Sequence, residues 1–152
     1  PYNISTPLIF KLLEQAQIIT DMHFMLQLEV VERLAASPGN KDWGRLGVMT
    51  QFRCEVEQLF EVPPEAFYPQ PKVRSAVVRL TPHPELPYPN VDPASLSRVV
   101  AQAFSQRRKT LRNNFKGTMK DSDFGALTID PGARAEKLSI ADLVAIAIHL
   151  QG

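Results

Sequence analysis

Residues 62–80 read VPPEAFYPQPKVRSAVVRL. Four prolines between positions 63 and 71 hold φ near its proline value and keep the residues before them out of the α region. Phe67 and Tyr68 are therefore expected on a stiff, extended loop, which is a rigid mount for an aromatic ring. After this loop, β-branched and small residues alternate over 73–80 and predict a strand that ends at the breaker Pro82.

The sequence before this loop predicts an α/β layout. Residues 55–62 indicate a strand that pairs with 73–80 across the proline loop, as an antiparallel hairpin at the edge of a sheet. The continuous apolar run Met22–Leu26 is typical of a strand buried on both faces in a parallel sheet. Apolar residues at helical spacing predict helices over about 6–15, 28–36 and 44–53.

The sequence after this strand predicts a linker and a helical domain. Five prolines between positions 82 and 93 exclude a helix or a central strand there. Asp92 and Pro93 then form an N-cap and a first-turn proline, and they open a helix expected to reach about Lys116 and to stop at Gly117. Three shorter helices are expected over 122–129, 130–136 and 139–150. The predicted boundaries are 1–82, a linker at 83–91, and an all-α domain at 92–152.

The composition limits the class of protein. With 152 residues of which 44% are hydrophobic, the chain supports one sizeable core, or an incomplete domain and a small second one. No apolar run is long enough to span a bilayer and no signal peptide is recognisable, so we expect a cytoplasmic protein. The single cysteine, Cys54, excludes an internal disulfide, and three scattered histidines indicate no metal. Because Pro1 leads straight into a helix, the chain is expected to begin inside a longer polypeptide.

The charges are segregated along the chain. Seven of the 17 Lys and Arg residues lie between Arg98 and Lys120, a segment that holds no Asp or Glu. The rest of the chain has ten Lys and Arg against 16 Asp and Glu, a formal charge of −6, although the whole chain has +1. A basic element on an acidic body favours a polyanionic partner.

Four short motifs are spread over the whole length of the chain. They are Pro1-Tyr2 before a helix, AFYPQPKVRSAVV at 66–78, QRRKTLRN at 106–113, and the residues DP, RAE and LS between 130 and 139. In combination they resemble the ribosomal RNA adenine N6,N6-dimethyltransferases that modify small-subunit RNA, and the resemblance covers essentially the whole chain. It implies the second half of a Rossmann-like S-adenosylmethionine-dependent methyltransferase domain with an antiparallel edge hairpin, followed by a small all-α domain.

The resemblance also implies residue roles. In the family, Asn-Leu-Pro-Tyr ends the fourth strand, and only Pro1 and Tyr2 of that tetrapeptide are present here. The backbone carbonyl of Pro1 would accept a hydrogen bond from the adenine N6 amine, while Tyr2 and Phe67 would stack on the adenine ring. The expected catalytic residues are thus Pro1, Tyr2 and Phe67. The cofactor site is expected upstream of Pro1, because the sequence has neither a strand followed by Gly-x-Gly nor an acid placed for the ribose.

Simpler interpretations of these residues stay open. Phe67 could be a core side chain, and Tyr2 could pack on the helix that follows it. Cys54 is expected to be a small packed apolar residue and His23 a core histidine. In the position where the family usually has Gln-Lys-Glu, this chain has Gln27-Leu28-Glu29, so a charge-pairing role there is in doubt.

The basic segment has a predicted geometry. On a continuous helix over 92–116, four cations fall within an arc of about 100° beside an apolar arc; they are Arg108, Lys109, Arg112 and Lys116. With no acid at i±4, these four are expected to contact RNA phosphates, although a merely solvated face is the alternative. Arg107 projects into the apolar arc and is expected to be structural, with an acid such as Glu136 as its partner.

The leading hypothesis is the C-terminal part of a small-subunit (16S) rRNA adenine dimethyltransferase that acts on a 30S assembly intermediate. The part alone is expected to be inactive. The alternatives are a 23S rRNA adenine methylase and a non-catalytic RNA-binding ribosome assembly factor.

Overall fold

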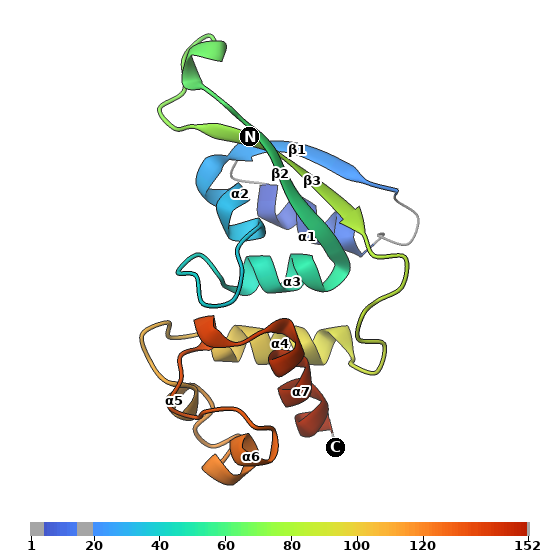
Figure 1. Cartoon of the computed structure of the whole chain (residues 1–152), viewed down its shortest axis with the longest axis vertical. Helices are drawn as coiled ribbons and strands as arrows, with labels where there is room; N and C mark the ends of the chain where they lie inside the picture. Colours follow the sequence, from blue (N-terminus) through green and yellow to red (C-terminus); the bar gives the residue numbers. More distant parts are fainter. Residues whose placement is uncertain (1–4, 15–19, 152) are drawn as a thin grey trace. The chain divides into compact units, whose positions relative to one another are not determined.

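The computed structural model describes residues 5–14 and 20–151, and it divides into two compact units (Figure 1). The first consists of the described part of Pro1–Ala36 with Met49–Pro87, and the second of Ser37–Val48 with the described part of Tyr88–Gly152. Pro1 and Tyr2 lie outside the described residues. Within those residues, no helix is long and apolar enough to cross a membrane.

A three-stranded sheet forms the first unit. Its strands β1 (Met22–Gln27), β2 (Cys54–Val62) and β3 (Ser75–Pro82) lie in the order β1-β3-β2, and both pairs are antiparallel. The hairpin predicted from 55–62 and 73–80 is confirmed by the pairing of β2 with β3. The helices α1 (Ser5–Leu13), α2 (Leu28–Leu34) and α3 (Arg45–Arg53) agree with the three predicted helices to within a few residues.

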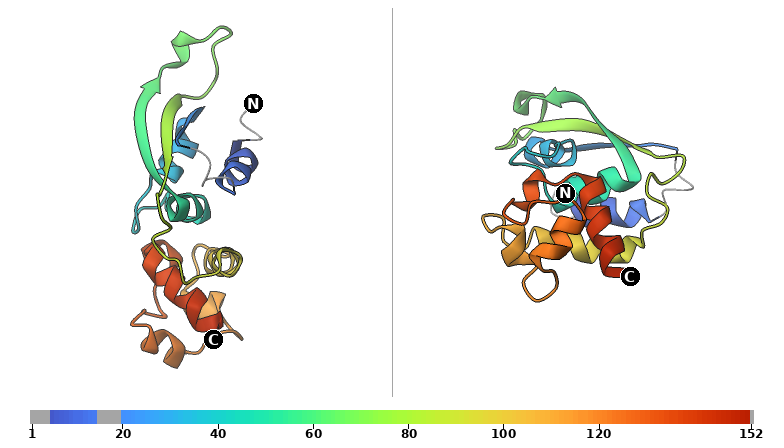
Figure 2. Two further views of the ribbon diagram at one scale, coloured as in Figure 1. Left: turned by 90° about the vertical axis from the view of Figure 1, so that its right-hand side faces the viewer. Right: turned by 60° about the horizontal axis from the view of Figure 1, so that its bottom comes forward.

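The prediction of a parallel strand buried on both faces is wrong for β1. In the described sheet its hydrogen-bonded neighbour is the antiparallel β3. Its burial alternates, with Met22 and Leu26 buried while Met25 is 46% exposed and His23, expected in the core, is also exposed. The reason is that α1 and α2 lie on the same side of the sheet (Figure 2), so only one set of alternate side chains is covered.

Cys54 begins β2 on the covered face. The thiol is free and buried, as expected for a packed small side chain, and this burial raises its pKa to about 11 despite the neighbouring Arg53 guanidinium. A free thiol in the unfolded chain has its ordinary value of 9.0. The folded state therefore holds this proton more tightly, so this group stabilises the fold below pH 9 and the contribution is lost as pH rises through 11.

We expect Cys54 to resist alkylation in the folded protein at pH 8. Roughly one thiol in a thousand is ionised there when folded, against roughly one in ten when unfolded, and burial blocks the reagent as well. Iodoacetamide labelling followed by mass spectrometry should be at least about a hundredfold slower in buffer than in denaturant. Equal rates in the two solutions would contradict the burial of Cys54.

The second unit contains helices around one apolar core. They are α4 (Pro93–Ala103), α5 (Leu111–Asn114), α6 (Asp121–Ala126), the 3-10 turn η4 (Ala135–Lys137) and α7 (Ile140–Gln151). The rings of Phe115 and Phe124 meet edge to face at 6.0 Å, and both are fully buried. The side chains of Leu96, Leu111 and Leu143 are fully buried as well.

The predicted continuous helix over 92–116 is wrong, because α4 ends at Ala103 and α5 begins only at Leu111. The Asn114 side chain donates hydrogen bonds to the Ala103 carbonyl (2.9 Å) and the Gln106 carbonyl (3.1 Å), which supplies partners where the helix stops. Thr110 then caps α5 through its side chain. The predicted stop at Gly117 is late, because α5 already ends at Asn114 with Phe115 as its C-cap; Gly117 follows in a turn with φ +86°, a conformation that favours glycine. Of the helix expected over 130–136, only η4 forms.

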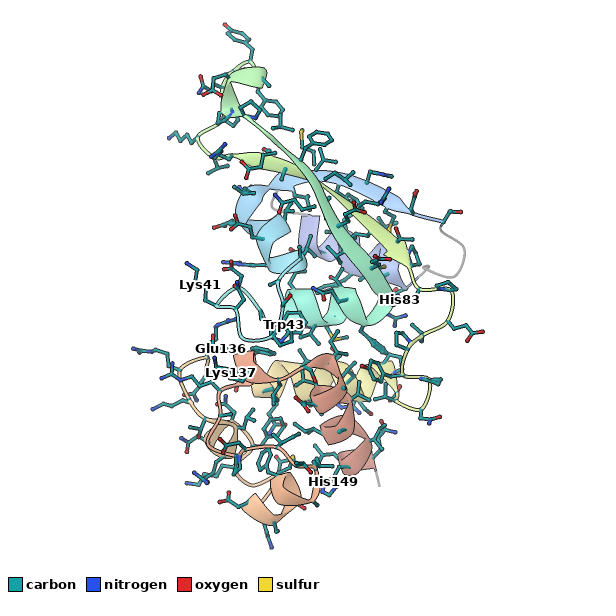
Figure 3. All side chains as sticks on the ribbon, viewed as in Figure 1. Lys41, Trp43, His83, Glu136, Lys137 and His149 are labelled. Carbon is teal, nitrogen blue, oxygen red and sulfur yellow. The ribbon has the colours of Figure 1, made fainter. Side chains whose placement is uncertain are left out.

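A segment from the middle of the chain completes the second unit. Trp43 is 1% exposed, and its indole N–H donates a 2.8 Å hydrogen bond to the Leu138 carbonyl (Figure 3). The Gly39 amide likewise donates to the Glu136 carbonyl at 2.7 Å. Because of these contacts, residues 37–48 group with 88–152, whereas the sequence predicted one domain over 1–82. The other predicted domain boundaries stay a prediction.

Candidate functional site

The loop between β2 and β3 carries the predicted aromatic mount. It contains the 3-10 turn η3 (Pro64–Ala66), in which the amides of Ala66 and Phe67 donate to the carbonyls of Pro63 (3.0 Å) and Pro64 (3.1 Å). The loop lies at the end of the long hairpin (Figure 1), and its Tyr68–Pro69 peptide bond is cis. Phe67 is half-buried, so part of its ring is accessible, whereas Tyr68 is 101% exposed.

A shallow pocket lies at the base of the same loop. It has a volume of about 370 Å³ and is lined by Gln27, Leu28, Glu29, Glu32, Val73 and Arg74. The Leu28 amide donates to the Arg74 carbonyl at 2.9 Å, which ties the start of α2 to the strand that leaves the loop. Leu28, which stands where the family usually has Lys, therefore contributes apolar surface. Arg74 forms an ion pair with Glu61 at 3.0 Å.

The three expected catalytic residues are only partly placed. Pro1 and Tyr2 lie outside the described residues, so the predicted pairing of the Tyr2 and Phe67 rings stays a prediction. Phe67 is in the part of the chain that the structure describes, on a fixed turn, but it does not line the pocket at the loop base. Within residues 5–14 and 20–151, no three His, Cys, Asp or Glu side chains are grouped as metal ligands.

The predicted basic residues do not share one helix face. Arg108 and Lys109 lie in the turn between α4 and α5, and Lys116 follows α5. These three side chains are exposed, and no ion pair with another described residue is formed by any of them. All three side chains therefore face solvent, as a phosphate contact requires.

Arg112 differs from the other three cations. Its Nε and Nη2 donate to the two carboxylate oxygens of Asp121 at 2.9 Å each. This hydrogen bonding lowers the pKa of Asp121 and raises that of Arg112. No acid lies at i±4 of Arg112, as the sequence showed, but an acid nine residues away neutralises it. A bidentate pair leaves Arg112 less available to a phosphate.

Arg107 is structural, as expected, but the predicted pairing with Glu136 is wrong. Its Nη2 donates to the carbonyls of Lys41 (2.7 Å) and Trp43 (2.9 Å), and its guanidinium carbon lies 5.7 Å from the centre of the Phe104 ring. The guanidinium passes close to Gly44, where an added Cβ would lie 2.8 Å from Nη1 of Arg107 unless that side chain shifted. Sequence reasoning missed this arrangement, because spacing carries no signal for a contact 64 residues apart.

The sequence of this chain is similar to those of ribosomal RNA adenine methyltransferases. A family model described as ribosomal RNA adenine dimethylase matches residues 1–152. Ribosomal RNA small subunit methyltransferase A of Chromohalobacter salexigens is 60% identical over 150 residues, which are 99% of this chain and 53% of the relative. The protein of that name from Pseudomonas aeruginosa is also 60% identical, over 99% of this chain and 56% of the relative.

Solved structures give the same class of fold. A dimethyladenosine transferase from Plasmodium falciparum superposes with a TM-score of 0.83 at 25% identity, over 96% of this chain and 62% of that one. The 23S rRNA methyltransferase ErmE superposes with a TM-score of 0.67 at 23% identity, over 100% of this chain and 63% of that one, which shows likeness of fold alone. The antiparallel sheet with its helices is thus consistent with a Rossmann-like methyltransferase fold.

The chain belongs to the ribosomal RNA adenine dimethylase family. Its named relatives are small-subunit rRNA methyltransferases, and the chain spans about half of their length.

Proposed function

We propose that this chain is the C-terminal part of an S-adenosylmethionine-dependent enzyme that dimethylates adenosine N6 in small-subunit (16S) rRNA. The observation that carries the proposal is the 60% identity to small-subunit methyltransferases over 99% of the chain. The first unit then corresponds to the second half of the catalytic domain, and residues 92–152 form a small all-α domain that contacts RNA. The protein acts in the cytoplasm on a 30S assembly intermediate.

Positioning is the main chemical task of the proposed site. The N6 lone pair of adenine is delocalised into the purine, so the amine must be drawn out of conjugation and aimed at the methyl donor. In the proposal, the Pro1 carbonyl accepts one N6 hydrogen while Tyr2 and Phe67 stack on the ring, at about 1–3 kcal/mol for each base–aromatic contact. The adenosine must first leave its stack in the RNA. Half-burial of Phe67 on a fixed turn supports this role.

The methyl group is supplied by S-adenosylmethionine, but the described residues do not fit that cofactor. Residues 5–14 and 20–151 contain no Gly-x-Gly loop after a strand, which is the usual phosphate- or cofactor-binding turn of such sheets. We therefore assign no cofactor-binding residue in this chain. In a protein of the named relatives' full length, we propose that the cofactor site lies in the half that this chain does not cover. This chain alone is then inactive.

Methyl transfer by a protein of the relatives' full length tests the proposal. Such a protein, carrying this chain, is expected to transfer radiolabelled methyl groups from S-adenosylmethionine to undermethylated 30S subunits. Digestion of the product RNA should yield N6,N6-dimethyladenosine. Binding to subunits without transfer would favour a non-catalytic assembly factor. Transfer to 23S RNA in preference to 30S subunits would favour a 23S rRNA adenine methylase. Either result would contradict the proposal.

The exposed cations give a second expected result. In the full-length protein, Arg108→Ala, Lys109→Ala and Lys116→Ala should each weaken subunit binding and lower the slope of log K against log salt by about one unit per lost phosphate contact. Arg98→Ala, which removes an exposed cation of α4, is the matched control and should leave the slope unchanged. If the slopes of all four variants equalled that of the wild type, the three cations would not contact phosphates and would serve solubility.

A further inference from the structure

Tyr68 is an aromatic side chain that the proposed reaction leaves unused. Its 101% exposure means that its ring packs against nothing in the part of the chain that the structure describes. Tyrosine is enriched in binding interfaces because its ring is large and apolar and its hydroxyl is polar, so a fully exposed ring at the end of a hairpin is available as a contact surface.

The backbone beside Tyr68 sets the side of the loop from which its side chain projects. Phe67 has φ −113° and ψ 152°, which is an extended conformation. Successive side chains in extended backbone point to opposite sides. This agrees with the different exposure of the two rings, since Phe67 is half-buried and Tyr68 faces solvent. The two rings therefore cannot hold the same base between them.

The backbone that carries the ring is also ordered before any partner arrives. The hydrogen bonds of η3 precede it, and the strands of the hairpin pair up to Val62 and Ser75. A tyrosine side chain has few rotatable bonds, so a contact made by this ring loses little conformational entropy. An aromatic ring on such an ordered backbone suits the flat face of a base.

The charges on the loop argue against a purely electrostatic contact. Lys72 is an exposed cation four residues from Tyr68, and Glu65 is the exposed acid of the turn. The other two charges, Arg74 and Glu61, neutralise each other. One cation is enough for a neighbouring phosphate, but the loop has no excess charge that could bind RNA by itself, so stacking has to supply most of the contact.

We infer that Tyr68 stacks on a nucleobase of the substrate RNA next to the adenosine that is methylated, and so keeps the strand splayed while Phe67 faces the target. This inference rests on the proposed function. It makes Tyr68 an RNA-binding residue that determines how the strand lies, with no part in the transfer step.

Kinetics of three variants in the full-length protein test the inference. Tyr68→Ala should raise KM for undermethylated 30S subunits at least about fivefold and change kcat less than about twofold. Tyr68→Phe should retain wild-type KM, because the ring stays. Gln70→Ala, an exposed side chain of the same loop, is the matched control and should behave as wild type. An unchanged KM for Tyr68→Ala, or an equal rise for Tyr68→Phe, overturns the inference.

A crosslink identifies the partner of the ring. Photolysis of the full-length protein with Tyr68→p-azidophenylalanine, bound to undermethylated 30S subunits, should give an adduct that ribonuclease trims to a short oligonucleotide. An adduct to a ribosomal protein, or none, overturns the inference. If wild type transfers methyl groups and these results are negative, only the inference fails; if wild type transfers none, the proposed function fails and the inference with it.

Discussion

Full-length protein with Phe67→Ala is expected to transfer methyl groups roughly a hundredfold more slowly than wild type while its affinity for subunits changes little. The proposed role of Phe67 is to hold one face of a single adenine, and loss of that contact leaves the amine misplaced relative to the methyl donor. Subunit binding rests instead on many other contacts. Single-turnover transfer to undermethylated 30S subunits and filter binding to the same subunits measure the two quantities separately.

Phe67→Tyr is the matched control, because it keeps an aromatic ring on the same turn. It should recover most of the transfer rate if the ring acts by stacking. Equal losses of transfer and binding in Phe67→Ala, or a loss of folding detected by circular dichroism, would instead assign Phe67 to the core, since the side chain is half-buried.

Trp43→Ala is expected to destabilise the second unit by about 3–5 kcal/mol. The ring is almost fully buried, and its removal opens a cavity and also leaves the Leu138 carbonyl without its donor. Because Trp43 is the chain's one tryptophan, unfolding in guanidinium chloride should be followed by circular dichroism.

Trp43→Phe separates the two contributions to this loss. It keeps most of the apolar volume but removes the indole N–H, so a smaller loss of about 1–3 kcal/mol is expected. A loss below about 1 kcal/mol for Trp43→Ala would mean that the segment 37–48 contributes little to the second unit.

Local sequence signals predicted most elements of the first unit. The prolines between 63 and 71 and the alternating residues 73–80 were enough to predict the hairpin and a stiff loop between its strands, because those effects act within a few residues, but the 3-10 turn in that loop was not predicted. The mistake at β1 arose because Met22–Leu26 is apolar throughout, and such a run does not show which alternate side chains a neighbouring helix will cover.

The helix predicted over 92–116 failed for a related reason. Phe104, Leu111 and Phe115 keep helical spacing across the turn, so the periodicity hides the break. Thr110 as an N-cap was a signal that could have located α5. The neutralisation of Arg112 by Asp121 depends on how the chain folds back, and spacing along one helix does not predict it.

The sequence predicted that Tyr2 and Phe67 stack on one adenine, but only Phe67 can be compared with the structure, because Tyr2 lies outside the described residues. Phe67 directly follows the hydrogen-bonded turn η3, in agreement with the predicted stiff loop. The difference between Phe67 and Tyr68 in exposure could be anticipated only as an alternation along extended backbone, because which ring faces inward depends on the tertiary fold.

Because residues 37–48 belong to the second unit, the chain cannot be cut into two independent domains at one point. Expression of 88–152 by itself would leave the Leu138 carbonyl and the Arg107 guanidinium without the groups that satisfy them. Swapping C-terminal helices between relatives should succeed only when the Trp43 segment is exchanged with them. The second unit is therefore built from two separate segments of the chain, 37–48 and 88–152. Substitutions in one segment are expected to be accompanied by compensating substitutions in the other during evolution.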